Sequence, residues 1–256
     1  MKFEANRPVK TSQKTFEIIE HLSRLDRVRI SEIAEQLDIS KGIVHNHVST
    51  LRELGYVRKI GEEYQLTPKM VNIGFQSRSN SRLFNAAHVP LTDAADSLDT
   101  GLILSEQAVT DSIVIDAQQL PDGIDLTIGT TLPFENSLTG LVIASIESQK
   151  LPDNTPPAYD LAEIKKTISE QGYALGPIMP SISTRSIVVP IVDDEDFCHG
   201  CVGVLFPIDV SDQQREQIIE ATVQLRTRIE NRLDSGWRST RSFATEKHSW
   251  ISLGGK

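Results

Sequence analysis

Five polar side chains recur at helical spacing in one short segment, and together they could hydrogen-bond to base edges and phosphates. They are Lys41, His45, Asn46, Ser49 and Arg52. Lysine and arginine donate to guanine and to phosphate oxygens, and asparagine can bond bidentately to adenine. Any one of these residues could simply be a solvated helix position, but five on one face favour contact with nucleic acid.

The sequence shows no competing catalytic arrangement. It contains no Gly-x-Ser-x-Gly motif, no phosphate loop and no His-Glu-x-x-His motif. We therefore predict that the protein is not an enzyme.

Two short amphipathic helices are needed to present the polar set. The first is expected over residues 31–37, and the second begins after Ser40, a candidate N-cap, and ends at Gly55. The second helix has an apolar stripe at intervals of three or four residues: Val44, Val48, Leu51 and Leu54. This stripe faces a core, so the opposite face carries the polar set together with Gly42.

A small basic hairpin follows the second helix. Residues 57–61 and 64–66 read as its two arms, and Arg58 and Lys59 are expected to meet phosphates. A helix pair followed by a basic hairpin is how a winged helix-turn-helix reads the major groove and holds the flanking backbone. We predict such a domain over residues 1–66, bound to double-stranded DNA. The alternative is a helix-turn-helix used only for protein contacts.

The charge distribution agrees with a DNA reader joined to a different module. The net charge is −9, but residues 1–82 hold 14 Lys and Arg against 10 Asp and Glu, and the remainder holds 12 against 25. A basic N-terminal region and an acidic C-terminal region fit a DNA-binding domain joined to a module that does not bind DNA. Because no run of 18 apolar residues and no secretory signal is present, we expect a cytoplasmic protein without membrane contact.

The remaining chain predicts an α+β domain behind a connector. Residues 67–84 read as a linker helix, residues 85–234 as a sheet flanked by helices, and residues 235–256 as a flexible tail. Strands are expected at residues 102–104, 112–115, 124–128, 186–192 and 201–206, and the last helix at 211–233. The linker helix is a candidate pairing surface, since Met70, Ile73 and Phe75 would otherwise be exposed.

Three rear segments could carry chemistry, and each has a plainer explanation. The helix opening at residues 137–140 could offer free backbone N–H groups to a carboxylate or phosphate, or be an ordinary capped helix. The pair Cys198 and Cys201 could be a redox switch or two buried thiols. It lacks the further ligands that zinc needs, so no metal or cofactor is predicted. The acids at 193–196 could hold a cation, but a solvated hairpin tip is the plainer explanation.

The front half resembles the winged helix-turn-helix of the IclR family of transcriptional regulators. The resemblance rests on the order of helix, turn, second helix, glycine, hairpin and linker helix in residues 31–74. The rear half resembles that family's GAF/PAS-like effector-binding domain with an antiparallel sheet. There, residues 129–140, 171–173 and 186–191 match its glycine-proline turn and helix opening, its Gly-Tyr segment and its Pro-containing strand.

The resemblance implies sites and partners. It implies DNA contact by the polar set with Ser40, Gly42, Arg58 and Lys59, and an operator bound by a homodimer or a dimer of dimers, which suits a palindrome. It also implies a small-molecule effector, such as an organic acid, a sugar derivative or an aromatic compound of catabolic metabolism. The implied effector-binding residues are Ser137, Leu138, Thr139, Gly140, Arg185, Ser186, Gly203 and Leu205.

The chain departs from the family pattern at its contact positions. Gly42 and Ile43 stand where small hydroxyl residues are usual, and Asn46 stands where arginine is usual, so a different operator sequence is expected. Leu141 replaces a lysine and Gly203 and Leu205 stand near expected serines, so the effector is more apolar or the pocket no longer binds a small acid. The alternative function is a redox- or metabolite-sensing module that acts mainly through protein contacts.

Overall fold

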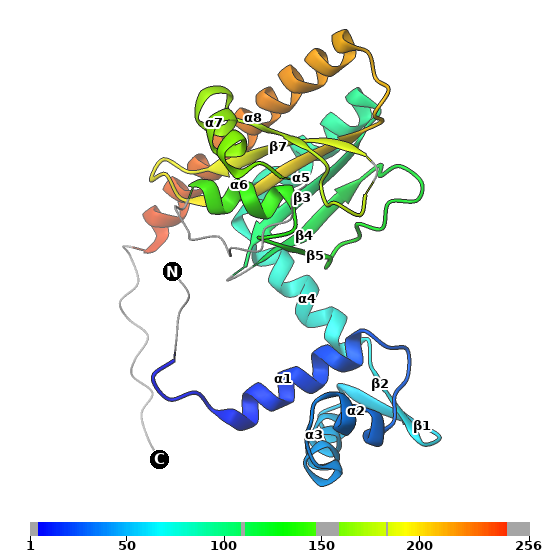
Figure 1. Ribbon diagram of the computed structural model, residues 1–256. Helices are drawn as coiled ribbons and strands as arrows, with labels where there is room; N and C mark the ends of the chain where they lie inside the picture. The colour runs from blue at the N-terminus through cyan, green and yellow to red at the C-terminus, as the bar shows by residue number, and fades with distance from the viewer. Residues whose placement is uncertain (1–4, 109–110, 147–158, 183, 245–256) are drawn as a thin grey trace. The chain divides into compact units, whose positions relative to one another are not determined.

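A computed structural model describes residues 5–108, 111–146, 159–182 and 184–244, and the chain forms two compact units. The first unit ends at Ser79 and the second begins at Asn80, which lies inside the predicted linker. Figure 1 shows the elements of each unit. None of the described helices has an apolar stretch long enough to cross a bilayer.

The first unit is a winged helix-turn-helix followed by one further helix. Its elements are α1 (Lys10–Ser23), α2 (Ile30–Gln36), α3 (Lys41–Glu53), β1 (Val57–Ile60), β2 (Glu63–Leu66) and α4 (Lys69–Asn80). The strands β1 and β2 pair in an antiparallel hairpin, and Val28 adds one bridge to Tyr64. One apolar cluster joins the three helices to the hairpin through residues such as Ile18, Ile33 and Val48. The predicted helix pair and wing are confirmed.

The predicted linker helix is shorter than expected. Helix α4 ends at Asn80, because Ser81 caps a new helix by accepting a hydrogen bond at Oγ from the Phe84 N–H, at 3.0 Å. That helix, α5 (Arg82–Leu98), belongs to the second unit and contains Pro90. The prediction of one linker helix running to residue 84 is therefore wrong at its C-terminal end.

The second unit is a six-stranded antiparallel sheet with helices on both faces. After α5 come β3 (Gly101–Gln107), β4 (Asp111–Gln118), β5 (Thr131–Pro133), α6 (Leu138–Ile146), α7 (Leu161–Gln171), β6 (Ala174–Gly176), β7 (Arg185–Val192), β8 (Cys198–Phe206) and α8 (Asp212–Ala244). The strand order is β5-β4-β3-β8-β7-β6. This arrangement confirms the predicted α+β fold with an antiparallel sheet.

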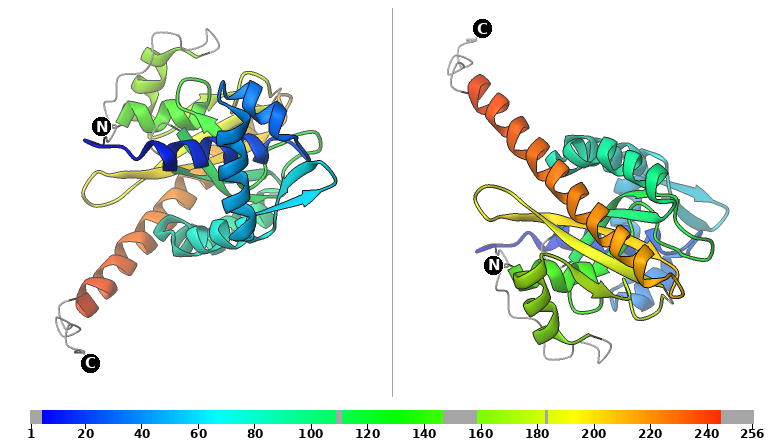
Figure 2. Two further views of the ribbon diagram at one scale, coloured as in Figure 1. Left: turned by 90° about the horizontal axis from the view of Figure 1, so that it is seen from below. Right: turned by 90° about the horizontal axis from the view of Figure 1, so that it is seen from above.

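Two apolar cores cover the two faces of this sheet. Helices α5 and α8 lie side by side and pack on one face, with Leu91, Leu104 and Phe206 in the core (Figure 2). Helix α6 packs on the other face, with Leu138, Leu141 and Leu205 in the core. The apolar runs of the central strands follow from this two-sided burial.

Two rear elements differ from their predictions. Residues 124–128 form no strand, and residues 131–133 pair with β4 instead. Helix α8 continues to Ala244, so residues 235–244, predicted as part of a flexible tail, are helical. Residues 245–256 of that predicted tail lie outside the described residues.

Candidate functional site

Helix α3 presents the predicted polar set on its exposed side. Ser40 caps the helix by accepting a hydrogen bond at Oγ from the Ile43 N–H, at 3.3 Å. The opposite face is anchored in the core by Val44, Val48 and Leu51. Leu54, predicted to belong to this buried stripe, is 53% exposed because α3 ends beside it, so that part of the prediction is wrong. The predicted residues on the exposed side are Lys41, Gly42, His45, Asn46 and Arg52, with Ser49 half-buried beside them. The first turns of this helix are therefore free to meet the edges of bases.

The wing holds its two predicted cations in contacts of its own. The Arg58 guanidinium donates to Gln65 Oε1 through Nε at 3.0 Å and Nη2 at 2.7 Å, and Gln65 Nε2 donates to Asp26 at 2.8 Å. Lys59 Nζ lies 3.5 Å from Glu62. Exposed ion pairs of this kind contribute about 0–1 kcal/mol, so a phosphate can replace the Glu62 carboxylate at small cost.

Two aromatic rings contact cations near the C-terminal end of helix α3, the proposed recognition helix. The Arg52 guanidinium and the Lys59 ammonium each lie 5.9 Å from the Tyr64 ring centroid, which joins α3 to the wing. Lys69 donates to the Leu54 carbonyl oxygen at 2.6 Å and lies 4.5 Å from the Tyr56 ring centroid. These cations fix the position of the C-terminal end of α3 relative to the hairpin. The sequence spacing did not reveal this role.

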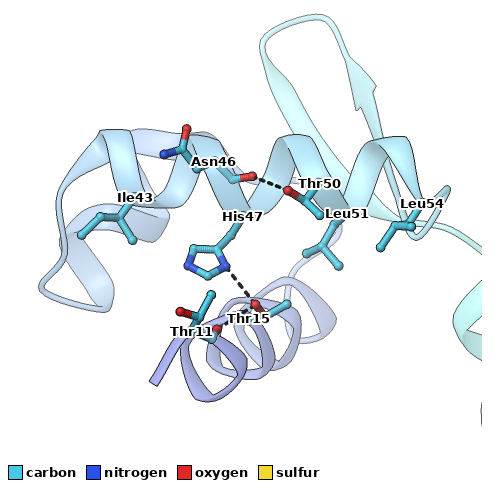
Figure 3. Close-up of a pocket in the computed structure, with 8 residues that line it drawn as sticks. All are labelled: Thr11, Thr15, Ile43, Asn46, His47, Thr50, Leu51 and Leu54. Atoms are coloured by element: carbon cyan, nitrogen blue, oxygen red, sulfur yellow. Dashed lines mark hydrogen bonds between the residues drawn. The ribbon is translucent and has the colours of Figure 1, made fainter. Parts of the chain in front are cut away.

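A groove of about 370 Å³ lies between α1 and α3 (Figure 3). Thr15 donates its hydroxyl hydrogen to the Thr11 carbonyl oxygen at 2.9 Å, and the same hydroxyl lies 2.9 Å from His47 Nδ1. The groove is lined by Thr11, Thr15, Ile43, Asn46, His47, Thr50, Leu51 and Leu54. Of these, only Asn46 belongs to the predicted DNA-binding set. The exposed apolar Ile43 was the sequence signal that could have extended the set.

The predicted helix opening of the second unit is closed by the protein's own groups. The Leu138 N–H donates to the Ile178 carbonyl oxygen at 3.0 Å, and the Gly140 N–H donates to Ser137 Oγ at 3.1 Å. Thr139 Oγ1 lies 3.3 Å from Ser137 Oγ and 3.2 Å from Ser112 Oγ. Of the two alternatives for this segment, the structure favours the ordinary capped helix, because the Leu138 and Gly140 N–H groups both already have an acceptor.

The strand residues predicted for the effector lie on the same side of the sheet as α6, with one exception. Ser186 donates to the Gly176 carbonyl oxygen at 2.8 Å and pairs in register with Leu205. A Cβ added at Gly203 would lie 3.0 Å from Ile103 and 3.3 Å from Ile178, so side chains fill the space above this glycine. The effector candidates thus converge, but on a packed core.

Arg185 is the exception. It is exposed and lines a separate cavity of about 520 Å³, together with Arg215 and Thr184. Phe206, which lies in the core under α5 and α8, also lines this cavity. The structure therefore places Arg185 apart from the other residues predicted to bind the effector.

The two cysteines are buried free thiols in the core under α6. Cys198 and Cys201 are three positions apart, a spacing that places side chains on opposite faces of a regular strand. A register shift between Ile191 and Val192 of β7, opposite this part of β8, accompanies the burial of both cysteines in the same core. Burial raises the pKa of the Cys201 thiol well above its usual range, and the neighbouring Cys198 raises it further. Reactive cysteines have lowered pKa values and exposed sulfurs, so this environment does not favour a redox switch.

The acidic hairpin tip between β7 and β8 is organised by one carboxylate. Asp193 accepts hydrogen bonds from the backbone N–H groups of Glu195 and Phe197, each at 3.0 Å, and from His199 Nε2 at 2.8 Å. The neighbouring Asp194, Glu195 and Asp196 are exposed, as expected of a solvated tip. Within the described ranges, no three His, Cys, Asp or Glu residues gather into a candidate metal site.

Comparison with known proteins supports both units. The IclR helix-turn-helix domain family matches residues 12–61. The HTH-type transcriptional regulator KdgR of Escherichia coli is 22% identical over 76% of this chain and 81% of its own length. The crystal structure of an IclR transcriptional regulator from Alicyclobacillus acidocaldarius covers 89% of this chain and all of its own, with a TM-score of 0.74 and 17% identity.

A third similar protein was solved with a small molecule. It is an IclR homologue from Microbacterium hydrocarbonoxydans complexed with 4-hydroxybenzoate, with a TM-score of 0.71 and 15% identity. The match covers 87% of this chain and 98% of the homologue. The two-unit fold described above is thus shared over nearly nine tenths of the chain.

Proposed function

We propose that the chain is an IclR-type transcriptional regulator that binds a palindromic operator as a homodimer, with α3 in the major groove. The observation that carries this proposal is the exposed polar face of α3, which begins at the Ser40 cap and includes Lys41 and Asn46. One recognition helix reads only a few base pairs, so two copies related by a two-fold axis are needed for a selective site. The exposed Arg58 and Lys59 hold the flanking phosphates.

The helix α4 supplies the pairing surface in this proposal. It has no buried residue, and Val71, Ile73 and Phe75 are 54%, 51% and 53% exposed. Apolar side chains that recur along one helix in this way mark a protein contact. We assign a second copy of α4 as the partner of this surface. Pairing of two α4 helices would bring two copies of α3 to one DNA duplex, as a two-fold operator requires.

The effector of the proposed regulator is a small organic acid, sugar derivative or aromatic compound that binds under α6. The relative bound to 4-hydroxybenzoate supports this class. In the described state Leu138, Ile103 and Ile178 occupy the space beside Gly176 and Gly203, so ligand entry must displace them. The polar partners present there are the hydroxyls of Ser137, Thr139 and Ser112.

A buried hydroxyl without a partner supports the same location. Ser105 is fully buried, and its Oγ makes no hydrogen bond within the described part of the chain. Ser105 pairs in register with Cys201, so its side chain faces the core under α6. A ligand oxygen or nitrogen at this point would satisfy a group that is otherwise costly to bury.

Selection of operator sequences from random duplexes by the full-length protein tests the DNA-binding proposal. We expect an enriched inverted repeat, bound more tightly than competitor DNA at moderate salt. Analytical ultracentrifugation of the complex should show two or four copies per duplex. Enrichment of no sequence, or specific binding by a single copy, would overturn the proposal.

Release of this operator by candidate catabolic acids, sugars and aromatics tests effector control. Thr139→Val should abolish the response while leaving operator affinity unchanged, whereas Arg185→Gln should leave the response intact. Loss of the response only in Arg185→Gln would show that the effector binds in the cavity of Arg185 and Arg215 instead. An effector can shift the DNA affinity only if it binds the two states unequally.

The redox alternative is tested by the double variant Cys198→Ser, Cys201→Ser. Both thiols are buried, so we expect peroxide to leave operator binding by the wild-type protein unchanged. A peroxide response that the double variant loses would establish the redox function instead.

A further inference from the structure

Gly42, Ile43 and Asn46 lie together near the N-terminus of helix α3. Gly42 and Asn46 are exposed, and Ile43 is 44% exposed. A Cβ added at Gly42 would meet only Ser40 Oγ, at 4.0 Å. The helix surface therefore has open space beside Gly42, and its backbone can come closer to a DNA base pair than a helix with a side chain there.

Ile43 and Asn46 border the groove between α1 and α3 without closing it. Figure 3 shows His47 directed towards Thr15 of α1, whereas Asn46 is directed away from that helix. The Thr50 hydroxyl donates to the Asn46 carbonyl oxygen at 3.0 Å. The side-chain amide of Asn46 and the exposed part of the Ile43 side chain thus remain available on adjacent positions of the helix surface.

We infer that Ile43 is a specificity-determining residue that contacts the C5-methyl group of a thymine in each half-site, beside an adenine bound by Asn46. This inference rests on the proposed function, because it needs α3 in the major groove. The first residues of a recognition helix contact base edges. Thymine offers the one apolar group on the major-groove edges of the four bases, and adenine offers the N6 and N7 pair that an asparagine amide matches.

Gly42, Ile43 and Asn46 then act together to recognise A·T sequence. Gly42 permits close approach, Asn46 reads adenine and Ile43 reads the methyl group of the paired or neighbouring thymine. Replacement of that thymine by cytosine would remove the methyl group and also change the adenine to guanine in its base pair. A hydroxyl side chain at position 43 would lack the apolar surface that this contact buries.

Deoxyuridine substitution tests the inference, since it removes only the C5-methyl group and keeps the hydrogen-bonding edge of thymine. The selected operator is resynthesised with each symmetric thymine pair replaced in turn, and binding is measured by fluorescence anisotropy. We expect about a fourfold loss of affinity per methyl at one thymine position, and roughly 10- to 20-fold when both half-sites are changed.

The variant Ile43→Ala should lose this sensitivity to deoxyuridine. Leu54→Ala is the matched control, because Leu54 lines the same groove and is 53% exposed but lies at the C-terminal end of α3. The control should keep the wild-type sensitivity. Both side chains are exposed, so neither change removes core packing.

The outcomes separate the inference from the proposed function. If an operator is enriched but no thymine methyl contributes through Ile43, the inference is overturned and the DNA-binding proposal stands. If no operator is enriched, the proposed function fails and the inference fails with it. Equal loss of deoxyuridine sensitivity in Ile43→Ala and Leu54→Ala would also overturn the assignment to Ile43.

Discussion

His47 Nδ1 of α3 lies 2.9 Å from Thr15 Oγ1 of α1, and this hydrogen bond ties the reading helix to the helix behind it. Because the Thr15 hydroxyl hydrogen is donated to the Thr11 carbonyl oxygen, His47 Nδ1–H is the donor in this contact. The side chains lie beside the groove that Ile43 and Asn46 border, so they set the position of the α3 surface relative to α1.

A double-mutant cycle should measure this contact. Thr15→Val and His47→Leu each remove one partner, and their coupling in the free energy of unfolding should be about 0.5–1.5 kcal/mol. Urea denaturation of the wild type, both single variants and the double variant provides the four values. Strict additivity would show that the hydrogen bond does not stabilise the domain.

Asn46→Ala should relax the base preference of the protein. Loss of one bidentate contact to adenine costs about 1–3 kcal/mol of discrimination against the wrong base. Repeating the operator selection with the variant should show weaker preference at one position of each half-site and unchanged preference elsewhere. An unchanged operator motif would contradict the assigned role.

Lys59→Ala should weaken binding evenly across sequences, in contrast to Asn46→Ala. The ammonium is expected to neutralise one phosphate, so the slope of log affinity against log salt should fall by about one per protomer. Titrations at several salt concentrations, with operator and with random DNA, measure both slopes. A loss confined to the operator would instead indicate that Lys59 reads a base.

Gly140→Ala should severely destabilise the second unit. The added Cβ would meet the Phe134 Cα and lie 2.8 Å from the Pro133 carbonyl oxygen, and backbone atoms cannot yield as a flexible side chain can. We expect a loss of about 3 kcal/mol or more, seen as a lower Tm in thermal unfolding. Gly74→Ala is the control, since its Cβ would meet nothing within 4 Å, and it should stabilise α4 by about 0.5–1 kcal/mol. Equal effects of the two changes would show that position 140 can relax.

The hairpin between β7 and β8 should depend on pH through Asp193. Burial alone would raise the pKa of this carboxyl group, but hydrogen bonds from His199 and from the Phe197 and Glu195 N–H groups outweigh it and lower the pKa. A lowered pKa means that the ionised form stabilises the folded state. The stabilisation is therefore present above the ordinary carboxyl pKa of 3.8 and is lost as the pH falls through the lowered value.

Asp193→Asn should reveal this dependence. We expect the variant to be less stable than the wild type at pH 7 by about 1–3 kcal/mol, because the charged acceptor of these hydrogen bonds becomes a neutral amide and the oxygen that faces His199 is lost. The difference should shrink as urea denaturation is repeated at pH values down to and below 4. A difference that stays constant over this range would show that the Asp193 charge does not contribute.

The elements of the first unit could be predicted from local sequence alone. The Ser40 cap, the stripe of Val44, Val48 and Leu51, and Gly55 after the last turn each act over a few residues, and the structure has α3 where they place it. The apolar runs of β7 and β8 were equally clear, because these strands are buried on both faces.

The element boundaries of the second unit were harder to predict. Several segments there have strand composition, and pairing with distant strands decides which of them forms a strand. Residues 124–128 have strand composition, yet β4 pairs with residues 131–133 instead. Ser81 is a local cap for α5, but the packing of α5 against α8 joins residues far apart in the chain and could not be seen in the local sequence.

The sequence by itself determined that this chain presents an exposed polar helix, a basic hairpin and an acidic α+β unit. The tertiary structure decided which of the implied effector groups are available to a ligand. Leu138 N–H is occupied by the Ile178 carbonyl oxygen and Gly203 is covered by Ile103, contacts between residues far apart in the chain. Helix periodicity and capping depend on neighbouring residues, whereas the occupancy of a donor or a cavity depends on packing from distant strands.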